Sequence, residues 1–393
     1  RKGTVYALAL DATKAFDRVQ FNKLFDVLLQ RDINPMYLRI LRTMYMNQKL
    51  MVRFGESVSD TFTVGNGVKQ GGVISPTLFA LYIDGLLTNL SKSGFGCTVG
   101  SKYCGAIGYV DDLILLAPTQ NALRKMVSVA EKYADEFFIK FNGSKNYLMV
   151  MERSASEVKP HVLVNNDVVK CTKNMIYLGH LINCNHFDPL VSCLVKDFNA
   201  KFNAFHGNFG CISSEVKNNL FRKYCCSFYG YQNCSLFDKD MEKFYVAWRK
   251  AQRRLWCLPD CTLTVLLPAI SGMSPPDFML EKRYMKFYLN GVNHKNTVVN
   301  FLFCQSLNTI SRVGDNVRYI SKKYGIFSRD IRKLSVNEIH KKMHDNVINN
   351  EIYEQIAAQI RELVDLRESI DFLFLDKSQI NDMISFLCTD IMP

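Results

Sequence analysis

The sequence predicts an α+β fold, in which an antiparallel sheet with helices on one face is followed by a region of helices alone. Short apolar strands alternate with helical patterns over residues 1–185, whereas only helical spacing continues after residue 186. Two adjacent carboxylates, Asp111 and Asp112, interrupt an apolar hairpin in the stretch CGAIGYVDDLILLAP. The first region is therefore expected to contain the chemistry and the sheet that positions it.

The first elements have clear local signals. The strand VYALALD ends on Asp11, and apolar residues at helical spacing predict a helix that begins near Phe21. Asn34 before Pro35 predicts the cap and first turn of a second helix. Alternating residues in 49–54 and 58–64 predict a hairpin around a glycine.

The second half of this region repeats the alternation. A glycine-rich loop leads to Ser75, which is predicted to cap a helix whose first residue is Pro76. The acidic hairpin is predicted to have its strands at 106–110 and 113–117, with both acids at the tip. The later predicted elements are a helix at 120–137, a strand region at 138–150, a hairpin at 162–169 and a strand at 175–182.

Composition limits the classes of partner. Lys and Arg number 49 against 37 Asp and Glu, which favours a polyanionic partner. No apolar run approaches the roughly 18 residues that span a bilayer, and the start of the chain has no signal-peptide pattern. Thirteen cysteines without a regular framework suggest thiols in a reducing compartment. We therefore expect a soluble intracellular protein of the cytoplasm or nucleus that does not enter membranes.

The acidic pair requires an explanation. A turn is the ordinary setting for adjacent Asp residues, yet the apolar flanks place this pair at the edge of a packed sheet. Asp11 also ends an apolar strand, and neighbouring strands would bring the three acids together. Protonation, a cationic side chain or a bound metal could relieve the repulsion, and an all-oxygen donor set is the kind that Mg²⁺ prefers.

Five short motifs occur in a characteristic order along residues 4–185. They are DATKAFD, GVKQGGVISP, YVDD, FNGSK and YLGH, and their order resembles the palm of reverse transcriptases, in particular those of non-LTR (LINE-type) retrotransposons. The later WRKAQRRLWCLP resembles the thumb side of the same proteins. The resemblance implies a right-hand polymerase with a palm at 1–185 and a helical thumb-like region at 186–290. A helical region of unknown role would follow at 291–393.

The resemblance assigns roles to the acids and to one lysine. Asp11 and Asp111 would ligate two Mg²⁺ ions, for which Mn²⁺ could substitute, together with the carbonyl of Ala12. Asp112 would help to bind the metal or orient the tip, and Lys145 would face the pyrophosphate. A helix-capping Asp11 and a solvated Lys145 are the structural alternatives.

Further roles follow from the other motifs. Phe16 would exclude a 2′-hydroxyl from the incoming sugar, and its alternative is a core aromatic residue. The remaining residues implied to contact the nucleotide or template are Gly67, Gln70, Gly71, Gly72 and Tyr109, and a flexible loop is the alternative for the second motif. The turn implied to hold the primer end is Tyr177, Leu178, Gly179 and His180, with an ordinary strand as its alternative.

Four basic residues near position 250 share one side of a predicted helix. The residues are Arg249, Lys250, Arg253 and Arg254, and they are expected to contact duplex phosphates. A solvated charged face is the competing interpretation.

The expected function is an RNA-directed DNA polymerase that extends a DNA primer on an RNA template with deoxynucleoside triphosphates. Because the chain begins almost at the first palm strand, a nucleic-acid-binding remnant without the fingers region is the main alternative. An RNA-dependent RNA polymerase shares the metal-binding acids, but Phe16 disfavours it. Endonuclease and RNase H motifs are not recognised in this sequence.

Overall fold

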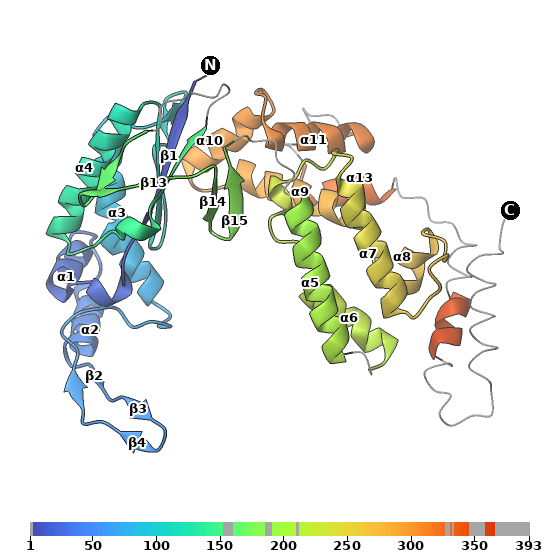
Figure 1. The fold of residues 1–393 in the computed structure, drawn as a ribbon, viewed down its shortest axis with the longest axis horizontal. Coiled ribbons are helices and arrows are strands. Elements are labelled where there is room, and N and C mark those ends of the chain that lie inside the picture. The colour runs from blue at the N-terminus through green and yellow to red at the C-terminus, as the bar shows by residue number, and fades with distance from the viewer. Residues whose placement is uncertain are drawn as a thin grey trace. The chain divides into compact units, whose positions relative to one another are not determined.

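The computed structural model describes residues 3–151, 160–184, 191–209, 212–326, 331, 334–345 and 358–365. The chain divides into two compact units, which we call unit 1 (Arg1–Asp188) and unit 2 (Pro189–Pro393) (Figure 1). Each unit has its own hydrophobic core. The expected roles of palm, thumb and C-terminal region, with the boundaries given above, stay predictions.

A five-stranded sheet forms the centre of unit 1, with strand order β13-β10-β1-β9-β8. The strands are β1 (Val5–Asp11), β8 (Ala106–Tyr109), β9 (Asp112–Ala117), β10 (Tyr147–Met151) and β13 (Lys170–Cys171). The central β1 is antiparallel to both β9 and β10. The short β13 joins the edge of β10 in parallel, so the sheet is not wholly antiparallel as predicted. The first strand of the chain is therefore buried between two later strands.

The two faces of this sheet are covered differently. Alternate residues such as Leu8 and Leu115 pack against α3 (Ser75–Lys92) and α4 (Gln120–Glu136) (Figure 1). The intervening residues, such as Ala7 and Ile114, pack with Met175 of the hairpin β14 (Asn174–Tyr177) and β15 (His180–Asn183). This mixture of sheet and helix confirms the predicted α+β class.

Two helices connect β1 to the glycine-rich loop. In α1 (Phe21–Leu29) the buried residues Phe21, Leu24 and Leu28 form the predicted apolar face. At the start of α2 (Pro35–Met46), the side chain of Asn34 accepts a hydrogen bond from the backbone N–H of Met36 at 2.9 Å. The predicted cap is therefore confirmed.

Unit 1 also contains smaller hairpins, and two of them are the hairpins that the sequence predicts. The first consists of β2 (Lys49–Leu50) paired with β5 (Phe62–Thr63) and β3 (Arg53–Phe54) paired with β4 (Ser57–Val58). The later one consists of β11 (Leu163–Val164) and β12 (Asp167–Val168). A further pair, β6 (Thr98–Val99) with β7 (Lys102–Tyr103), lies before the acidic hairpin. Two short 3-10 turns, η1 (Phe16–Arg18) and η2 (Gly143–Lys145), follow β1 and precede β10.

Three local predictions are wrong in detail. The residue before α3 is Ile74, and the Ser75 hydroxyl donates to the Lys69 carbonyl at 2.6 Å instead of capping the helix. The second strand of the acidic hairpin begins at Asp112, one residue earlier than predicted. The predicted strand at 175–182 is a hairpin, because Leu178 and Gly179 adopt φ values of 48° and 75° and form a two-residue turn.

Within its described residues, unit 2 contains helices and connecting turns but no strand, as the sequence predicts. Its named elements are α5 (Val191–Phe209), α6 (Ser214–Tyr224), η3 (Tyr231–Asn233), α7 (Met241–Leu255), α8 (Leu266–Ser271), α9 (Pro276–Val292), α10 (Thr297–Ser306), α11 (Arg312–Lys323) and α13 (Val336–Asp345). Phe198 lies at the centre of an aromatic cluster with Phe221, Phe228 and Phe244. These rings join α5, α6 and α7 around one core.

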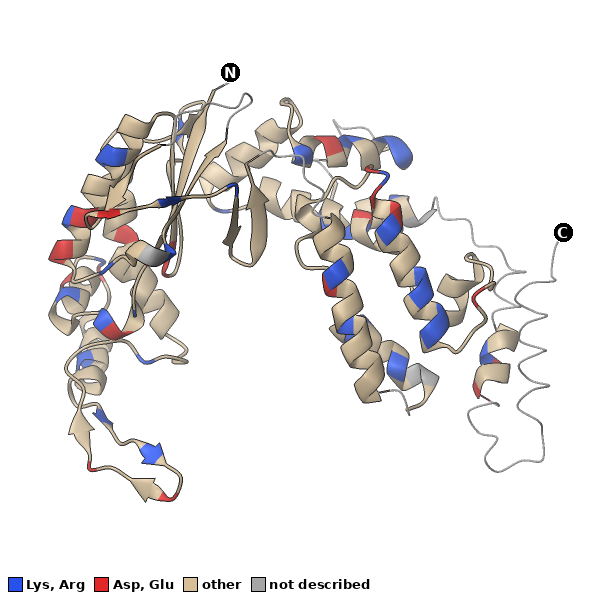
Figure 2. Cartoon of the chain, viewed as in Figure 1, with Lys and Arg blue, Asp and Glu red and all other residues tan. Residues whose placement is uncertain are grey.

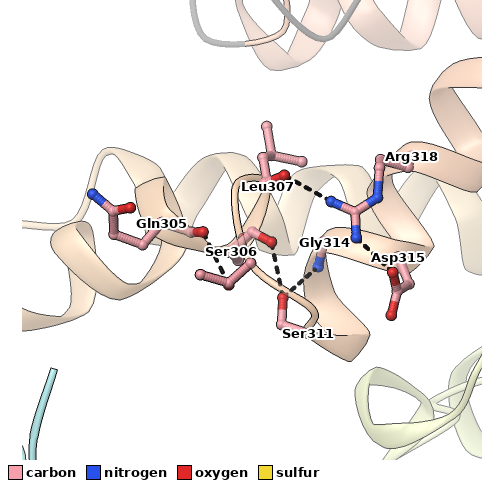
Figure 3. A network of polar contacts seen from close by, with 8 residues as sticks. Gln305, Ser306, Leu307, Ser311, Gly314, Asp315 and Arg318 are labelled. Carbon is pink, nitrogen blue, oxygen red and sulfur yellow. Dashed lines mark hydrogen bonds and ion pairs between the residues drawn. The ribbon is translucent and has the colours of Figure 1, made fainter. Parts of the chain in front are cut away.

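The turn between α10 and α11 is fixed by polar contacts (Figure 3). The Ser311 hydroxyl donates to the Ser306 carbonyl at 2.9 Å and accepts from the Gly314 N–H at 3.1 Å. Arg318 donates to the Leu307 carbonyl at 2.7 Å and pairs with Asp315. A Cβ at position 314 would lie 2.0 Å from the Ser306 carbonyl oxygen, so this close approach requires glycine.

Candidate active site

Strand register brings two of the predicted acids together. Asp11, the last residue of β1, is paired with Asp112, the first residue of β9. Directly paired residues project from the same face of a sheet with their Cβ atoms about 4.5–5.5 Å apart. Both carboxylates therefore lie on the face that carries Ala7 and Ile114, away from α3 and α4.

Asp111 lies beside this pair at the tip of the hairpin. Tyr109 and Asp112 close the hairpin, so Val110 and Asp111 form its turn. Val110 has a φ of 56°, which is a strained conformation for a β-branched residue and costs on the order of 1–3 kcal/mol. Tyr109 and Asp111 are exposed to solvent. The turn thus presents an acid and an aromatic side chain next to the paired acids.

The electrostatics of the three acids are unfavourable without a counter-charge. Burial raises the pKa of the Asp112 carboxyl, and the neighbouring Asp111 and Asp11 raise it further. Lys145 supplies part of the counter-charge, since its Nζ lies 3.9 Å from Oδ2 of Asp11. The structure therefore brings together all four residues that the sequence predicts to be catalytic.

The donor chemistry of this site fits a hard divalent cation, because each acid offers carboxylate oxygens. Burial and the two neighbouring carboxylates disfavour the ionised form of Asp112, which a cation would favour. Ala12 forms an isolated bridge with Phe141. The hydrogen bonds of this bridge are made by the Thr13 N–H and the Asp11 carbonyl, so the bridge does not use the Ala12 carbonyl. However, within the described ranges no three His, Cys, Asp or Glu side chains are already grouped as a metal-binding set. Binding would require the acid side chains to converge further.

The second motif contacts the first motif directly. The Gly67 N–H donates to the Val19 carbonyl and the Val68 N–H donates to the Phe16 carbonyl, both at 2.8 Å. Gly67 has a φ of 92°, and a Cβ there would lie 3.1 Å from backbone atoms of Asp17. This packing explains the glycine at 67 without invoking a bound nucleotide.

The other residues of the second motif also have neighbours within the chain. Gln70 donates to Oδ1 of Asp17 at 3.1 Å. Gly71 has a φ of 75° in open space, whereas a Cβ at Gly72 would lie 2.6 Å from the Ser75 hydroxyl. Of these glycines, Gly71 is therefore the one whose backbone is open to a ligand.

Phe16 lies beside the second motif in η1. Its ring packs on Phe79 with a centroid separation of 5.3 Å, and the side chain is half-buried. It therefore contacts the core and also keeps an exposed side. The structure is compatible with both of its predicted roles.

The fifth motif forms the turn of the β14–β15 hairpin. Tyr177 is paired with His180 across Leu178 and Gly179. The Tyr177 hydroxyl is buried without a hydrogen-bond partner, and burial raises its pKa, with a further increase from Asp112. This hairpin therefore lies on the sheet face that carries the acids.

The four basic residues of α7 divide into two pairs. Figure 2 shows basic residues along this helix, but Arg249 pairs with Glu242 and Arg253 donates to the Thr262 carbonyl at 2.6 Å. Lys250 and Arg254 are exposed, and the Arg254 guanidinium lies 5.3 Å from the centre of the Phe202 ring. Lys250 and Arg254 are therefore the two that remain available to an external phosphate.

Sequence reasoning missed Asn146, which follows Lys145. Its Oδ1 accepts a hydrogen bond from the Asp11 N–H at 3.1 Å, and the side chain is completely buried. A single side-chain amide that bonds to a distant main chain leaves no periodic pattern. The only available signal was its place directly after the fourth motif.

Comparison with known proteins identifies unit 1. Residues 1–182 match the family described as "Reverse transcriptase (RNA-dependent DNA polymerase)". The chain is 28% identical over 177 residues to the Pol polyprotein of the retrotransposable element R2 of Nasonia vitripennis, and 29% identical over 140 residues to that of R2DM of Drosophila melanogaster. Residues 1–182 form a reverse transcriptase domain of the LINE type.

The matched segments are parts of much longer relatives. The Nasonia match covers 45% of this chain and 17% of that protein, and the Drosophila match covers 36% and 13%. Among solved structures, apo telomerase from Candida tropicalis aligns over 98% of this chain and 53% of its own, with 12% identity and a TM-score of 0.37. A similarity this weak supports no argument about the reverse transcriptase domain. None of the helices in the described part of the chain combines the length and the apolar composition of a membrane span.

Proposed function

We propose that this chain is the polymerase core of a LINE-type reverse transcriptase, which extends a DNA primer on an RNA template. Unit 1 supplies the palm, and the helices of residues 186–290 serve as a thumb. The observation that carries the proposal is the pairing of Asp11 with Asp112 beside Asp111, within a domain of the reverse transcriptase family. The substrates are deoxynucleoside triphosphates.

The acids would hold two Mg²⁺ ions, with Mn²⁺ able to replace them. Asp11, Asp111 and the Ala12 carbonyl are the proposed ligands, and Asp112 helps to bind the metal or orients the tip. When bound, such ions activate the attacking 3′-hydroxyl and stabilise the leaving oxygen in phosphoryl transfer. Burial and the neighbouring carboxylates of Asp111 and Asp11 raise the pKa of Asp112, and a bound cation would offset the part that these two carboxylates contribute.

Lys145 and Phe16 would act on the incoming nucleotide. Lys145 is exposed beside Asp11, where its charge can neutralise the pyrophosphate and its ammonium can donate a proton to it. The exposed side of Phe16 would crowd a 2′-hydroxyl. Tyr109, Gln70 and the open backbone at Gly71 would contact the nucleotide or template, while Gly67 and Gly72 shape the loop that carries them.

The nucleic acid would be held by two further surfaces. The turn from Tyr177 to His180 would support the primer end, since Tyr177 belongs to the sheet face that carries the acids. Lys250 and Arg254 would contact phosphates of the duplex.

A nucleic-acid-binding protein without polymerase activity is the second candidate. One observation favours it. Within the described residues, no three Asp, Glu, His or Cys side chains are already close enough together to bind a metal ion. Such a protein would bind duplex through the same basic residues but would not add nucleotides.

Primer extension distinguishes the two candidates. The substrates are poly(rA), an oligo(dT) primer, dTTP and Mg²⁺, and the variant Asp111→Asn removes one proposed ligand. Asp135→Asn, on the exposed side of α4, is the matched control. We expect extension by the wild type and by the control, and its loss in Asp111→Asn with duplex binding retained. Duplex binding without extension by the wild type would favour the second candidate.

A further inference from the structure

The end of β1 that carries Asp11 lacks its regular strand neighbour on one side. The ladder between β1 and β10 begins with Ala9 paired to Tyr147. Asp11 therefore lies two residues beyond that ladder, whereas on its other side it is still paired with Asp112 of β9. Without another partner on the β10 side, the main chain at Asp11 would be held from one side only.

The segment 140–146 takes over this task. The Asn142 N–H donates to the Asp11 carbonyl at 2.8 Å, and the Thr13 N–H donates to the Lys140 carbonyl at 2.7 Å. Because η2 turns the chain out of the strand, no backbone carbonyl of β10 lies opposite the Asp11 N–H. The side-chain oxygen of Asn146 accepts this N–H instead, at 3.1 Å.

Asn146 fulfils this role at a cost. The side chain is 0% exposed, and its Nδ2 is buried with no hydrogen-bond partner. A buried donor without an acceptor is unfavourable, and an apolar side chain of similar size would avoid this cost. The cost is explained if the hydrogen bond from the Asp11 N–H to Oδ1 is what the position requires.

We propose that Asn146 is a positioning residue for Asp11, holding the end of β1 so that its carboxylate can bind a divalent cation with Asp111. This inference rests on the proposed function, because that function makes Asp11 a metal ligand. Residues that orient metal ligands typically change metal affinity by 10–100-fold when they are replaced. Removing the side-chain acceptor of Asn146 should therefore weaken metal binding without abolishing the fold.

The test measures binding of Mn²⁺ to the full chain by electron paramagnetic resonance, without nucleic acid. Asn146→Leu removes the acceptor at similar volume, and Asn146→Ala is the second variant if Leu prevents folding. Asn316→Leu is the matched control, since Asn316 is equally buried and its Oδ1 accepts the Leu236 N–H at 2.9 Å within unit 2. We expect about 10-fold weaker Mn²⁺ binding in the Asn146 variants and wild-type affinity in Asn316→Leu.

Hydrogen exchange at the Asp11 amide gives a readout that does not depend on metal. It should become faster in Asn146→Leu and stay unchanged in Asn316→Leu. Mn²⁺ affinity within about twofold of wild type in both Asn146 variants would overturn the inference. Mn²⁺ binding by a wild type that fails to extend a primer would contradict the proposed function alone, whereas no Mn²⁺ binding by the wild type would overturn both.

Discussion

At the scale of single residues, Asp112 carries a charge that the fold disfavours. Its pKa is raised by burial and by the two neighbouring carboxylates, so ionisation of Asp112 opposes folding. The penalty is absent below the ordinary pKa near 3.8, grows as the pH rises through the raised value and is complete above it. The site is therefore under electrostatic stress at neutral pH.

Asp112→Asn should relieve this stress. In metal-free buffer at neutral pH, the variant should unfold at a higher temperature than the wild type. The difference should shrink as the pH is lowered toward about 4, because Asp112 of the wild type then becomes protonated. Thermal unfolding followed at several pH values measures the effect, with Asp135→Asn as the control for a change of charge. A difference that does not vary with pH would contradict this assignment.

Phe16→Ala should change the choice of sugar. Removal of the ring opens space for a 2′-hydroxyl, so the ratio of UTP to dTTP incorporation on poly(rA) should rise. Phe79→Leu removes the buried ring against which Phe16 packs, and should lower stability while leaving the sugar preference near that of the wild type. An unchanged sugar preference in Phe16→Ala would make Phe16 a core residue.

Single residues differ in how well sequence predicts them. The nearness of Asp11 to the acidic pair was predictable, because apolar runs end at both, but the direct pairing of Asp11 with Asp112 was not, since the predicted strand began one residue later. Asn146 was not, since its role depends on where η2 leaves the strand. Ser75 was misassigned because the helix begins one residue earlier than predicted, so the Ser75 hydroxyl donates to the Lys69 carbonyl instead of accepting from an N–H of the first turn. Local sequence patterns do not predict hydrogen bonds between residues that are separated along the chain.

At the scale of elements, α7 shows how contacts within the chain distinguish side chains that helical spacing treats as equivalent. Helical spacing predicts that all four basic residues share one side, but it does not reveal that Glu242 and the Thr262 carbonyl engage two of them. The β14–β15 hairpin is similar, since a turn with a single glycine looked like a continuous strand. Strands, caps and helix periods were predictable wherever local chemistry alone determines them.

The division of α7 predicts different effects for its two pairs. Replacing both Lys250 and Arg254 with Gln should flatten the salt dependence of duplex binding, by about 0.7–0.9 in log–log slope for each phosphate that is no longer neutralised. The matched double variant of Arg249 and Arg253 should keep the wild-type slope and have lower stability instead. Fluorescence anisotropy across a salt series measures the slope. Equal slopes in wild type and both variants would indicate a solvated helix face.

Two Gly→Ala substitutions in unit 2, one at the turn between α10 and α11 and one in α5, should have opposite effects on stability. Gly314→Ala forces a Cβ against the Ser306 carbonyl and should destabilise unit 2 by on the order of 3 kcal/mol. Gly207→Ala in α5 meets nothing within 4 Å and should stabilise its helix by up to about 1 kcal/mol. Chemical denaturation measures both. Equal effects of the two substitutions would contradict the close approach in Figure 3.

At the scale of the whole molecule, the chain combines two units with separate cores. The sheet of unit 1 is built from strands that occur far apart in the sequence, and this is what brings the first and third motifs together. The aromatic core of unit 2 is built from successive helices. The change from mixed to purely helical periodicity was visible in sequence, because each architecture imposes its own spacing.

The activity proposed for this chain is the copying of RNA into DNA. This proposal is tested by measuring which nucleotide is incorporated on each RNA template. Primed poly(rA) and primed poly(rC) would each be incubated with the wild-type chain, Mg²⁺ and one nucleotide at a time. We predict incorporation of dTTP on poly(rA) and of dGTP on poly(rC), with little use of UTP or GTP. Incorporation that ignores the template, or that prefers ribonucleotides, would contradict the proposed activity.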